Sequence, residues 1–193
     1  FNAIRTLKAN LERVAVERMK VEFEKMILSP HRDLAFKAFV ESELYHSCPD
    51  FKEAKETLLK LGEFQLEKLT ITQAWILFAY YEQLTVPQLR KVLKDWKSSN
   101  DQISTILTGY QTLLARLEKE WDAFLAYECP EVLAIEVEQL LPGIGHSEQL
   151  VELEEVYRQL PIRSMKDIQI DGFGVKEALG LEKMGPIIGE VLQ

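Results

Sequence analysis

The two carboxylates of the stretch DIQID are the nearest that this sequence comes to a catalytic pair. Two-metal phosphoryl transfer needs acids that reach the same ions, as in Asp-x-Asp on a strand. Asp167 and Asp171 lie four residues apart and do not meet that spacing. The three histidines share no helical face, and no HExxH, GxSxG, P-loop or kinase signature is present. We therefore expect no catalytic residue, no metal and no cofactor within this chain.

Phosphate binding is a second chemistry, and it needs clustered cations. One helix-like stretch supplies them within about a third of a turn of a helical wheel: Arg90, Lys91, Lys94 and Lys97. The neighbouring arc is apolar, which predicts one helix with a positive outer edge. That edge is either a track for RNA phosphates or a solvated face, and the sequence leaves both interpretations open.

The charge along the chain is uneven. Eleven acidic and three basic residues between Arg116 and Leu160 account for the whole net charge of −8. This balance argues against a protein that binds nucleic acid through bulk charge, although it permits a local basic face. We expect the acids of this stretch to face solvent or to keep RNA away from a wrong face.

Cysteine usage and hydropathy indicate the cellular compartment in which we expect the protein. Cys48 and Cys129 belong to no CxxC motif, which favours free thiols in a reducing cytoplasm. The longest apolar run, from Ala74 to Tyr81, is far shorter than the roughly 20 residues of a membrane span. It predicts a helix buried on most sides. We expect a cytoplasmic protein with no membrane partner.

Helical periodicity dominates the sequence. Met19, Phe23 and Met26 belong to an apolar stripe with spacings of three and four residues. No alternating run is long enough for a sheet, so the expected fold class is all-α, an elongated array of short helices. Expected N-caps are Thr70, Thr85 and Ser99. The expected helices span residues 14–28, 31–44, 50–61, 71–83, 86–96, 100–126, 130–140, 147–160, 174–180 and 186–192.

A glycine-containing turn, LLPGIG at 140–145, invites a nucleic-acid interpretation. It is similar to the hairpin of a helix-hairpin-helix motif, in which backbone N–H groups hold a DNA phosphate. A basic residue usually follows such a hairpin, whereas His146, Ser147 and Glu148 follow here amid acidic residues that would repel phosphate. A plain turn between helices is the favoured interpretation.

The end of the chain carries a family resemblance. LPIRSMKDIQIDG at 160–172, followed by GPIIGEVL at 185–192, resembles the tail of bacterial class II CCA-adding enzymes, the CCA tRNA nucleotidyltransferases. That family typically shows Leu-Pro-Ile-x-Ser-x-x-Asp-Leu-x-Ile-x-Gly, a short helix, and Gly-Pro-x-x-Gly. The one departure in the first motif is Ile168, where leucine is commoner.

Two further stretches resemble the same family in the same order. RVAVERMKVEFEKMI at 13–27 is similar to its neck motif, with Glu17, Arg18 and Glu22 in place. Ala15 stands where the family usually has serine, and losing that N-cap should weaken the helix start by about 1 kcal/mol. DWKSSN at 95–100 is similar to the Trp-Lys-x-Ser-Asn of the body region.

The resemblance implies a parent enzyme that adds C, C and A to the tRNA 3′ end from CTP and ATP. Its catalytic head, which holds Mg²⁺, would precede the neck and is missing from this chain. We expect neck helices at 1–28, a helical body at 29–126, and acidic helices with a tRNA-binding tail at 127–193. Such a fragment would be catalytically inactive, with the acceptor and T arms of tRNA and the missing head as partners. Monomer and homodimer both stay open.

The resemblance also assigns expected roles. Glu17, Arg18 and Glu22 would brace the head and support its active site. In the tail, Arg163, Ser164 and Lys166 would follow a helix ended by Pro161 and meet RNA phosphates. Gly185 would open a helix whose N–H groups face phosphate. The alternative is that the tail isoleucines pack a small core while its cations are solvated.

Two other functions stay open. The same region of a bacterial poly(A) polymerase, or of a CC- or A-adding enzyme, would carry similar motifs. An all-α helix-hairpin-helix-like module for DNA binding or protein interaction would use the LPGIG turn.

Overall fold

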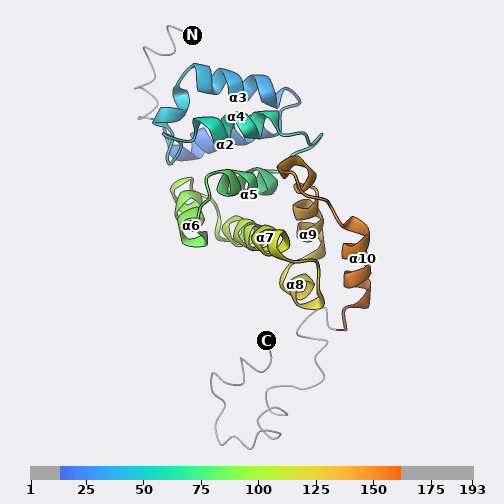
Figure 1. Cartoon of the computed structure of the whole chain (residues 1–193). Coiled ribbons are helices and arrows are strands. Elements are labelled where there is room, and N and C mark those ends of the chain that lie inside the picture. Colours follow the sequence, from blue (N-terminus) through green and yellow to red (C-terminus); the bar gives the residue numbers. More distant parts are fainter. Residues whose placement is uncertain (1–13, 162–193) are drawn as a thin grey trace, which may run out of the picture. The chain divides into compact units, whose positions relative to one another are not determined.

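The structure is a computed structural model that describes residues 14–161, so positions 1–13 and 162–193 lie outside the description that follows. The described residues form helices joined by short connections and contain no strand, which confirms the all-α prediction (Figure 1). The helices are α2 (Val16–Ile27), α3 (Arg32–Glu41), α4 (Lys55–Glu63), α5 (Ile71–Tyr81), α6 (Val86–Asp95), α7 (Asn100–Glu118), α8 (Ala123–Glu128), α9 (Glu131–Glu138) and α10 (Leu150–Gln159), with 3₁₀ turns η2 (Leu44–Ser47) and η3 (Pro142–Ile144).

Several helix starts follow from local chemistry that the sequence displays. Thr70 caps α5 in a capping box, because its Oγ1 accepts from the Gln73 N–H while the Gln73 side chain accepts from the Thr70 N–H. Ser99 accepts from the Gln102 N–H and caps α7. At α6 the Gln88 side chain accepts from both the N–H and the hydroxyl of Thr85. The three predicted caps are therefore at helix starts.

Two predicted helices differ most from the structure. The expected helix over 100–126 breaks at Lys119, whose backbone is extended, and resumes as α8. Asp122 causes the restart because its Oδ1 accepts from the Leu125 N–H at 2.7 Å. The expected helix over 50–61 starts only at Lys55, since Asp50 adopts a left-handed backbone with φ 59°.

The core is built around α7, which packs against α5, α6, α8 and α9 (Figure 1). Helix α5 is buried on almost every side, with all residues from Gln73 to Ala79 withdrawn from solvent, as its apolar run predicts. An aromatic cluster joins α2 to this core. The ring centroids of Phe51 and Trp96 are 4.6 Å apart, and that of Phe23 lies 5.0 Å from Phe51 and 5.2 Å from Trp96.

The chain divides after Arg158 into two units, and the described helices lie in the first apart from the last residue of α10. The division into neck, body and tail stays a prediction. Between residues 14 and 161, no helix combines the length and the hydrophobicity that crossing a bilayer requires.

Candidate functional site

Helix α2 presents two faces with different roles. Its inner face buries Met19, Phe23 and Ile27, so the phenylalanine of the neck motif is a core residue. Its outer face exposes Glu17, Arg18 and Glu22. Arg18 and Glu22 lie four residues apart on this face, but Glu22 Oε1 accepts from Lys25 Nζ at 2.8 Å.

The three neck residues border a largely apolar cavity of about 780 Å³. Its wall combines α2 with the end of α3, the η2 turn and the start of the α6–α7 connection. Val21 in this wall is 49% exposed, which is high for a β-branched apolar side chain on a packed helix. The support of an active site by Glu17, Arg18 and Glu22 stays a prediction. The apolar residues in the wall are Val14, Met19, Val21, Phe23, Met26, Phe39, Leu44, Cys48 and Trp96.

Lys20 holds α2 against the start of α7, a contact that the sequence did not predict. Its Nζ donates to Gln102 Oε1 at 2.6 Å and to Ser98 Oγ at 3.3 Å. Nζ also lies 3.7 Å from Glu24 Oε1, and the side chain is only 14% exposed. These contacts join α2 to the turn between α6 and α7 and to the first turn of α7.

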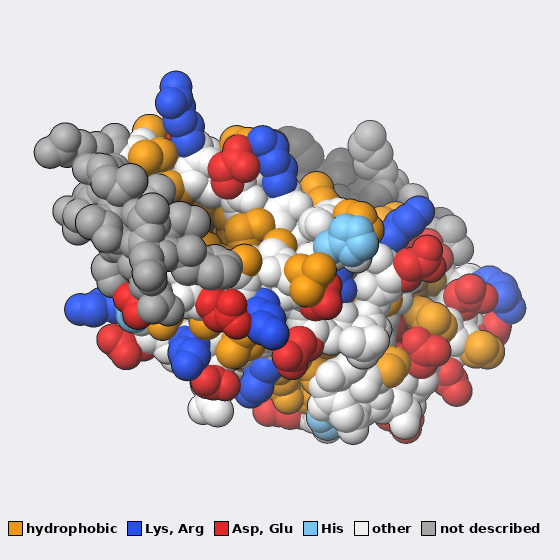
Figure 2. Space-filling model, turned by 90° about the horizontal axis from the view of Figure 1, so that it is seen from above, with side chains coloured by type: hydrophobic (Ala, Val, Ile, Leu, Met, Phe, Trp, Pro, Cys, Tyr) orange, Lys and Arg blue, Asp and Glu red, His pale blue; other side chains and the backbone are white. Residues whose placement is uncertain are grey.

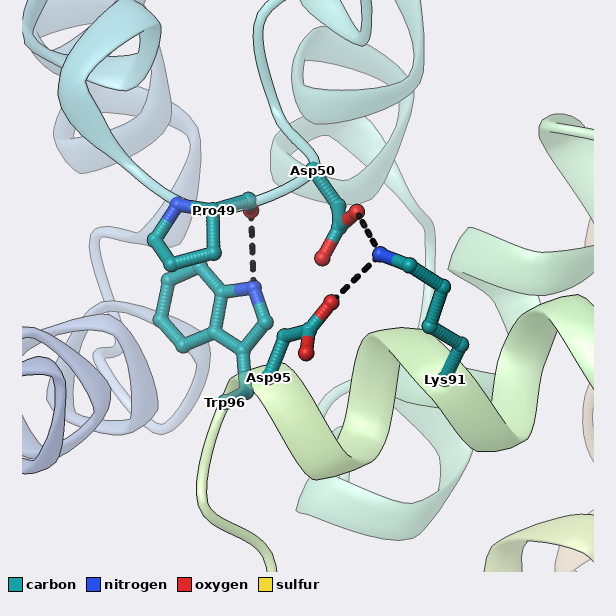
Figure 3. Close-up of polar contacts among 5 residues, drawn as sticks. All are labelled: Pro49, Asp50, Lys91, Asp95 and Trp96. Atoms are coloured by element: carbon teal, nitrogen blue, oxygen red, sulfur yellow. Dashed lines mark hydrogen bonds and ion pairs between the residues drawn. The ribbon is translucent and has the colours of Figure 1, made fainter.

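The predicted basic edge lies on α6, and its members differ in how much charge they offer. Lys91 Nζ lies 3.3 Å from Asp50 Oδ1 and also pairs with Asp95 (Figure 3). These two carboxylates raise the pKa of Lys91, with the Asp95 hydrogen bond as the largest cause. The positive charge of Lys91 is therefore offset by these two carboxylates. Arg90 and Lys94 are exposed and form no ion pair or side-chain hydrogen bond with other described residues.

The same close-up shows how this end of α6 is joined to the loop before α4. Trp96 is fully buried, and its Nε1 donates to the Pro49 carbonyl at 2.9 Å (Figure 3). Lys91 forms an ion pair with Asp50, the residue that follows Pro49. Trp96 and Lys91 thus fasten the end of α6 to the loop before α4.

Lys97 is placed differently from the helical-wheel prediction. Helix α6 ends at Asp95, and Lys97 follows with a left-handed φ of 55°. Its N–H donates to the Lys94 carbonyl, and the Ser98 N–H donates to the Leu93 carbonyl, both at 2.9 Å. This is the hydrogen-bond pair of a Schellman ending, which usually has glycine at the position of Lys97. The side chain stays exposed beside the helix end.

The expectation that the acids of the acidic stretch face solvent is wrong for Glu138. This residue is fully buried, with its Oε1 accepting from Arg116 Nε and Trp121 Nε1, both at 2.6 Å. Its Oε2 accepts from the Gln149 N–H at 2.6 Å. A buried carboxylate with three donors is a structural centre, and only its exposed neighbours contribute to surface repulsion.

Charges of both signs are interspersed on the face of the molecule seen in Figure 2, with hydrophobic side chains between them. A net-acidic chain can hold RNA only where cations gather locally. The α6 edge with Lys97 is the local group that the structure describes for this purpose. The tail residues predicted to contact RNA, which are Arg163, Ser164, Lys166 and Gly185, lie outside the described residues.

The LPGIG turn has a packing explanation. Pro142–Ile144 forms η3, and Gly145 ends it with a left-handed φ of 87°. A Cβ added at Gly143 would collide with the Phe64 ring. Gly143 is therefore required by its contact with the α4 end, and this turn needs no nucleic-acid ligand to explain its glycines.

In the described part of the chain, no group of three or more His, Cys, Asp and Glu residues is placed to hold a metal ion. The residues present therefore do not fit the Mg²⁺ site that the resemblance implies for a catalytic head.

Comparison with known proteins places these features in a family. The family model described as "tRNA nucleotidyltransferase domain 2" matches residues 65–193, and the one described as "Probable RNA and SrmB- binding site of polymerase A" matches residues 1–55. The CCA-adding enzyme of Enterococcus faecalis is 31% identical over an alignment of 187 positions, which covers 95% of this chain and 46% of the relative. That of Bacillus cereus strain AH820 is 30% identical over an alignment of 195 positions, which covers 99% of this chain and 48% of the relative.

A solved structure shares the fold. The Bacillus stearothermophilus CCA-adding enzyme, crystallised in complex with CTP, superposes with a TM-score of 0.85 at 22% identity. The alignment covers 99% of this chain and 49% of that one, and this chain spans about half the length of the curated relatives that it matches. Because the first family model spans more than half of this sequence, the chain belongs to the tRNA nucleotidyltransferase family, with bacterial CCA-adding enzymes among its relatives.

Proposed function

We propose that this chain supplies tRNA binding to a CCA-adding nucleotidyltransferase, the enzyme that adds C, C and A to the tRNA 3′ end. The observation that carries the proposal is the family match across residues 65–193, which includes the exposed cations of α6. The chain would hold the acceptor and T arms in the cytoplasm. Catalysis, with Mg²⁺ and with CTP and ATP, would belong to a head outside these residues.

The charges on α6 suit this task. Every tRNA must be accepted, so recognition has to rely on phosphates and shape more than on sequence. Arg90, Lys94 and Lys97 are exposed and are not held in ion pairs with other described residues, so their charges are available to phosphate. Lys91 is held by two carboxylates and should contribute less.

The same region of a poly(A) polymerase, another nucleotide-adding enzyme, is an alternative. The family model that matches residues 1–55 names polymerase A, which favours the corresponding region of a poly(A) polymerase. A CC- or A-adding enzyme is a further alternative. Nucleotide addition to tRNA by the full-length protein distinguishes these activities by the sequence of the added nucleotides.

The test is a titration of labelled tRNA with the chain between about 50 and about 200 mM salt. Replacing Arg90, Lys94 and Lys97 together by glutamate should lower the affinity at least about tenfold and make the salt dependence shallower. Three exposed lysines outside α6 provide a control with the same charge change when replaced by glutamate: Lys37, Lys52 and Lys55.

Equal losses in the two triple variants would contradict the assignment to α6. An unmodified chain without salt-sensitive tRNA affinity would contradict the proposed function itself. Tighter binding of duplex DNA than of tRNA would instead support the DNA-binding module.

A further inference from the structure

Arg32 is a buried cation that the proposed function does not use. It is the first residue of α3, and only 9% of its surface is exposed. Its Nη2 atom donates to the carbonyls of Phe64 at 2.6 Å and Leu66 at 3.0 Å, just after the end of α4. These acceptors are neutral, and no carboxylate in the described part of the chain forms an ion pair with Arg32.

One buried nitrogen of this guanidinium has no partner among the described residues. Arg32 Nε forms no hydrogen bond within residues 14–161, although a buried donor is normally paired. Burial also lowers the pKa of Arg32, against the opposing effect of Asp33, which means that the charge lies where water solvates it poorly. A charged group with an unused donor in such a place is stabilised by an anion that reaches it.

Arg32 lines an open cavity of about 660 Å³, and other groups in the wall suit an anion. Lys68 is exposed there and forms no ion pair within residues 14–161. Glu67 is the single acid in the wall. The cavity therefore brings together two cations and one carboxylate.

Two helix N-termini meet the same cavity. Helix α3 begins at Arg32, and α5 begins at Ile71, and both residues are in the wall. Figure 1 shows that the two helices begin on the side of the α4–α5 connection. The amides of Arg32 and Asp33 at the start of α3, and those of Ile71 and Thr72 at the start of α5, have no acceptor among the described residues. The next amide of α5, that of Gln73, already donates to Thr70 Oγ1. Both helices are long enough to present the partial positive charge that favours phosphate.

We infer that this cavity binds a phosphate group, with Arg32, Lys68 and the first amides of α3 and α5 as its donors. The volume lies within the usual range for small-ligand sites and exceeds what one phosphate fills. Leu28, Leu69 and Ile71 form an apolar part of the wall beside the donors, which suits the nucleoside that would carry the phosphate. The carrier is either a free nucleotide or an RNA strand, and the second case rests on the proposed function.

The test follows the Nε–H signal of Arg32 by NMR while inorganic phosphate replaces chloride at constant ionic strength. We expect a saturable shift, and Lys68→Met should weaken binding at least about fivefold because one charge-assisted contact is lost. Lys37→Met, on the exposed side of α3, is the matched control and should bind as the unmodified chain does. Arg32→Lys should weaken binding too. The inference does not depend on that variant, which also loses contacts to the α4 end.

The absence of a saturable shift, or equal behaviour of Lys68→Met and Lys37→Met, would overturn the site. CMP that binds more tightly than phosphate identifies a free nucleotide as the carrier, whereas tRNA that moves the Arg32 signal identifies an RNA phosphate. Phosphate binding without tRNA binding would refute the proposed function and keep this site. Binding of tRNA without any phosphate effect at Arg32 would refute this site and keep the proposed function.

Discussion

Arg116 on α7 donates from Nε to Oε1 of Glu138 on α9 at 2.6 Å, and their side chains are 7% and 0% exposed. The same carboxylate accepts from Trp121 ahead of α8 and from the Gln149 N–H ahead of α10. One acid therefore connects four segments of the chain. The start of the segment leading to α10 is therefore held by a carboxylate that belongs to a buried charge pair.

Removing that acid should be costly. Glu138→Ala leaves Arg116 buried without its counter-charge, so the free energy of unfolding should fall by about 3–5 kcal/mol. Urea denaturation measures this change. Glu154→Ala, at an exposed acid on α10, should change it by no more than about 0.5 kcal/mol.

A double replacement sharpens this result. Arg116→Met combined with Glu138→Leu should cost less than Glu138→Ala alone, because no unpaired charge is left in the core. A double variant that is less stable than the single one would show that the pair stabilises the fold beyond avoiding an isolated charge.

The sequence predicted the helices whose signals are local. The apolar stripe of α2, the buried run of α5 and the caps at Thr70 and Ser99 depend on residues within a few positions of one another. The break after α7 was missed because the apolar pattern continues through it. Asp122, a residue with strong N-cap preference three positions before Leu125, was the signal that could have revealed it.

The buried charges could not be predicted for a different reason. Glu138 is one of eleven acids in its stretch, and its partner Arg116 is 22 residues away. Arg32 donates to carbonyls 32 and 34 residues away. Nothing in the spacing distinguishes these residues from solvated ones, since only tertiary packing decides which charge is enclosed. The exposed cations of α6 were predictable because amphipathic periodicity is itself a local property.

The start of α2 offers a stabilising change. Ala15 is the N-cap of α2 with ψ 137°, and no side chain caps the helix there. Ala15→Ser supplies an oxygen for the free N–H groups of the first turn, so the free energy of unfolding should rise by about 1 kcal/mol. Ala15→Val should give no such gain, and an equal gain from both would exclude capping as the cause.

Alkaline pH should destabilise the fold through its thiols. Burial raises the pKa of Cys48 from 9.0 to about 11, so the folded state holds this proton more tightly than the unfolded chain does. Stability is therefore complete below the unfolded pKa and declines as pH rises from about 9 toward 11.

The matching variant is Cys48→Ala, which should make that decline shallower in urea denaturations performed from neutral to alkaline pH. Some decline should persist because burial also raises the pKa of Cys129. A pH profile unchanged by Cys48→Ala would show that this thiol titrates alike in both states.

Lys97 allows stability and RNA binding to be separated in one residue. Its φ of 55° costs a non-glycine residue free energy, and the Schellman ending around it favours glycine. Lys97→Gly should raise the free energy of unfolding by about 1 kcal/mol, because it removes this strain.

If Lys97 contacts a phosphate, the same variant should bind tRNA more weakly and lower the salt slope by about 0.7–0.9. Lys97→Met removes the charge and keeps the strain, so it should match Lys97→Gly in tRNA affinity without gaining stability. A Lys97→Gly chain that is more stable and binds tRNA as tightly as before would leave Lys97 a structural role alone.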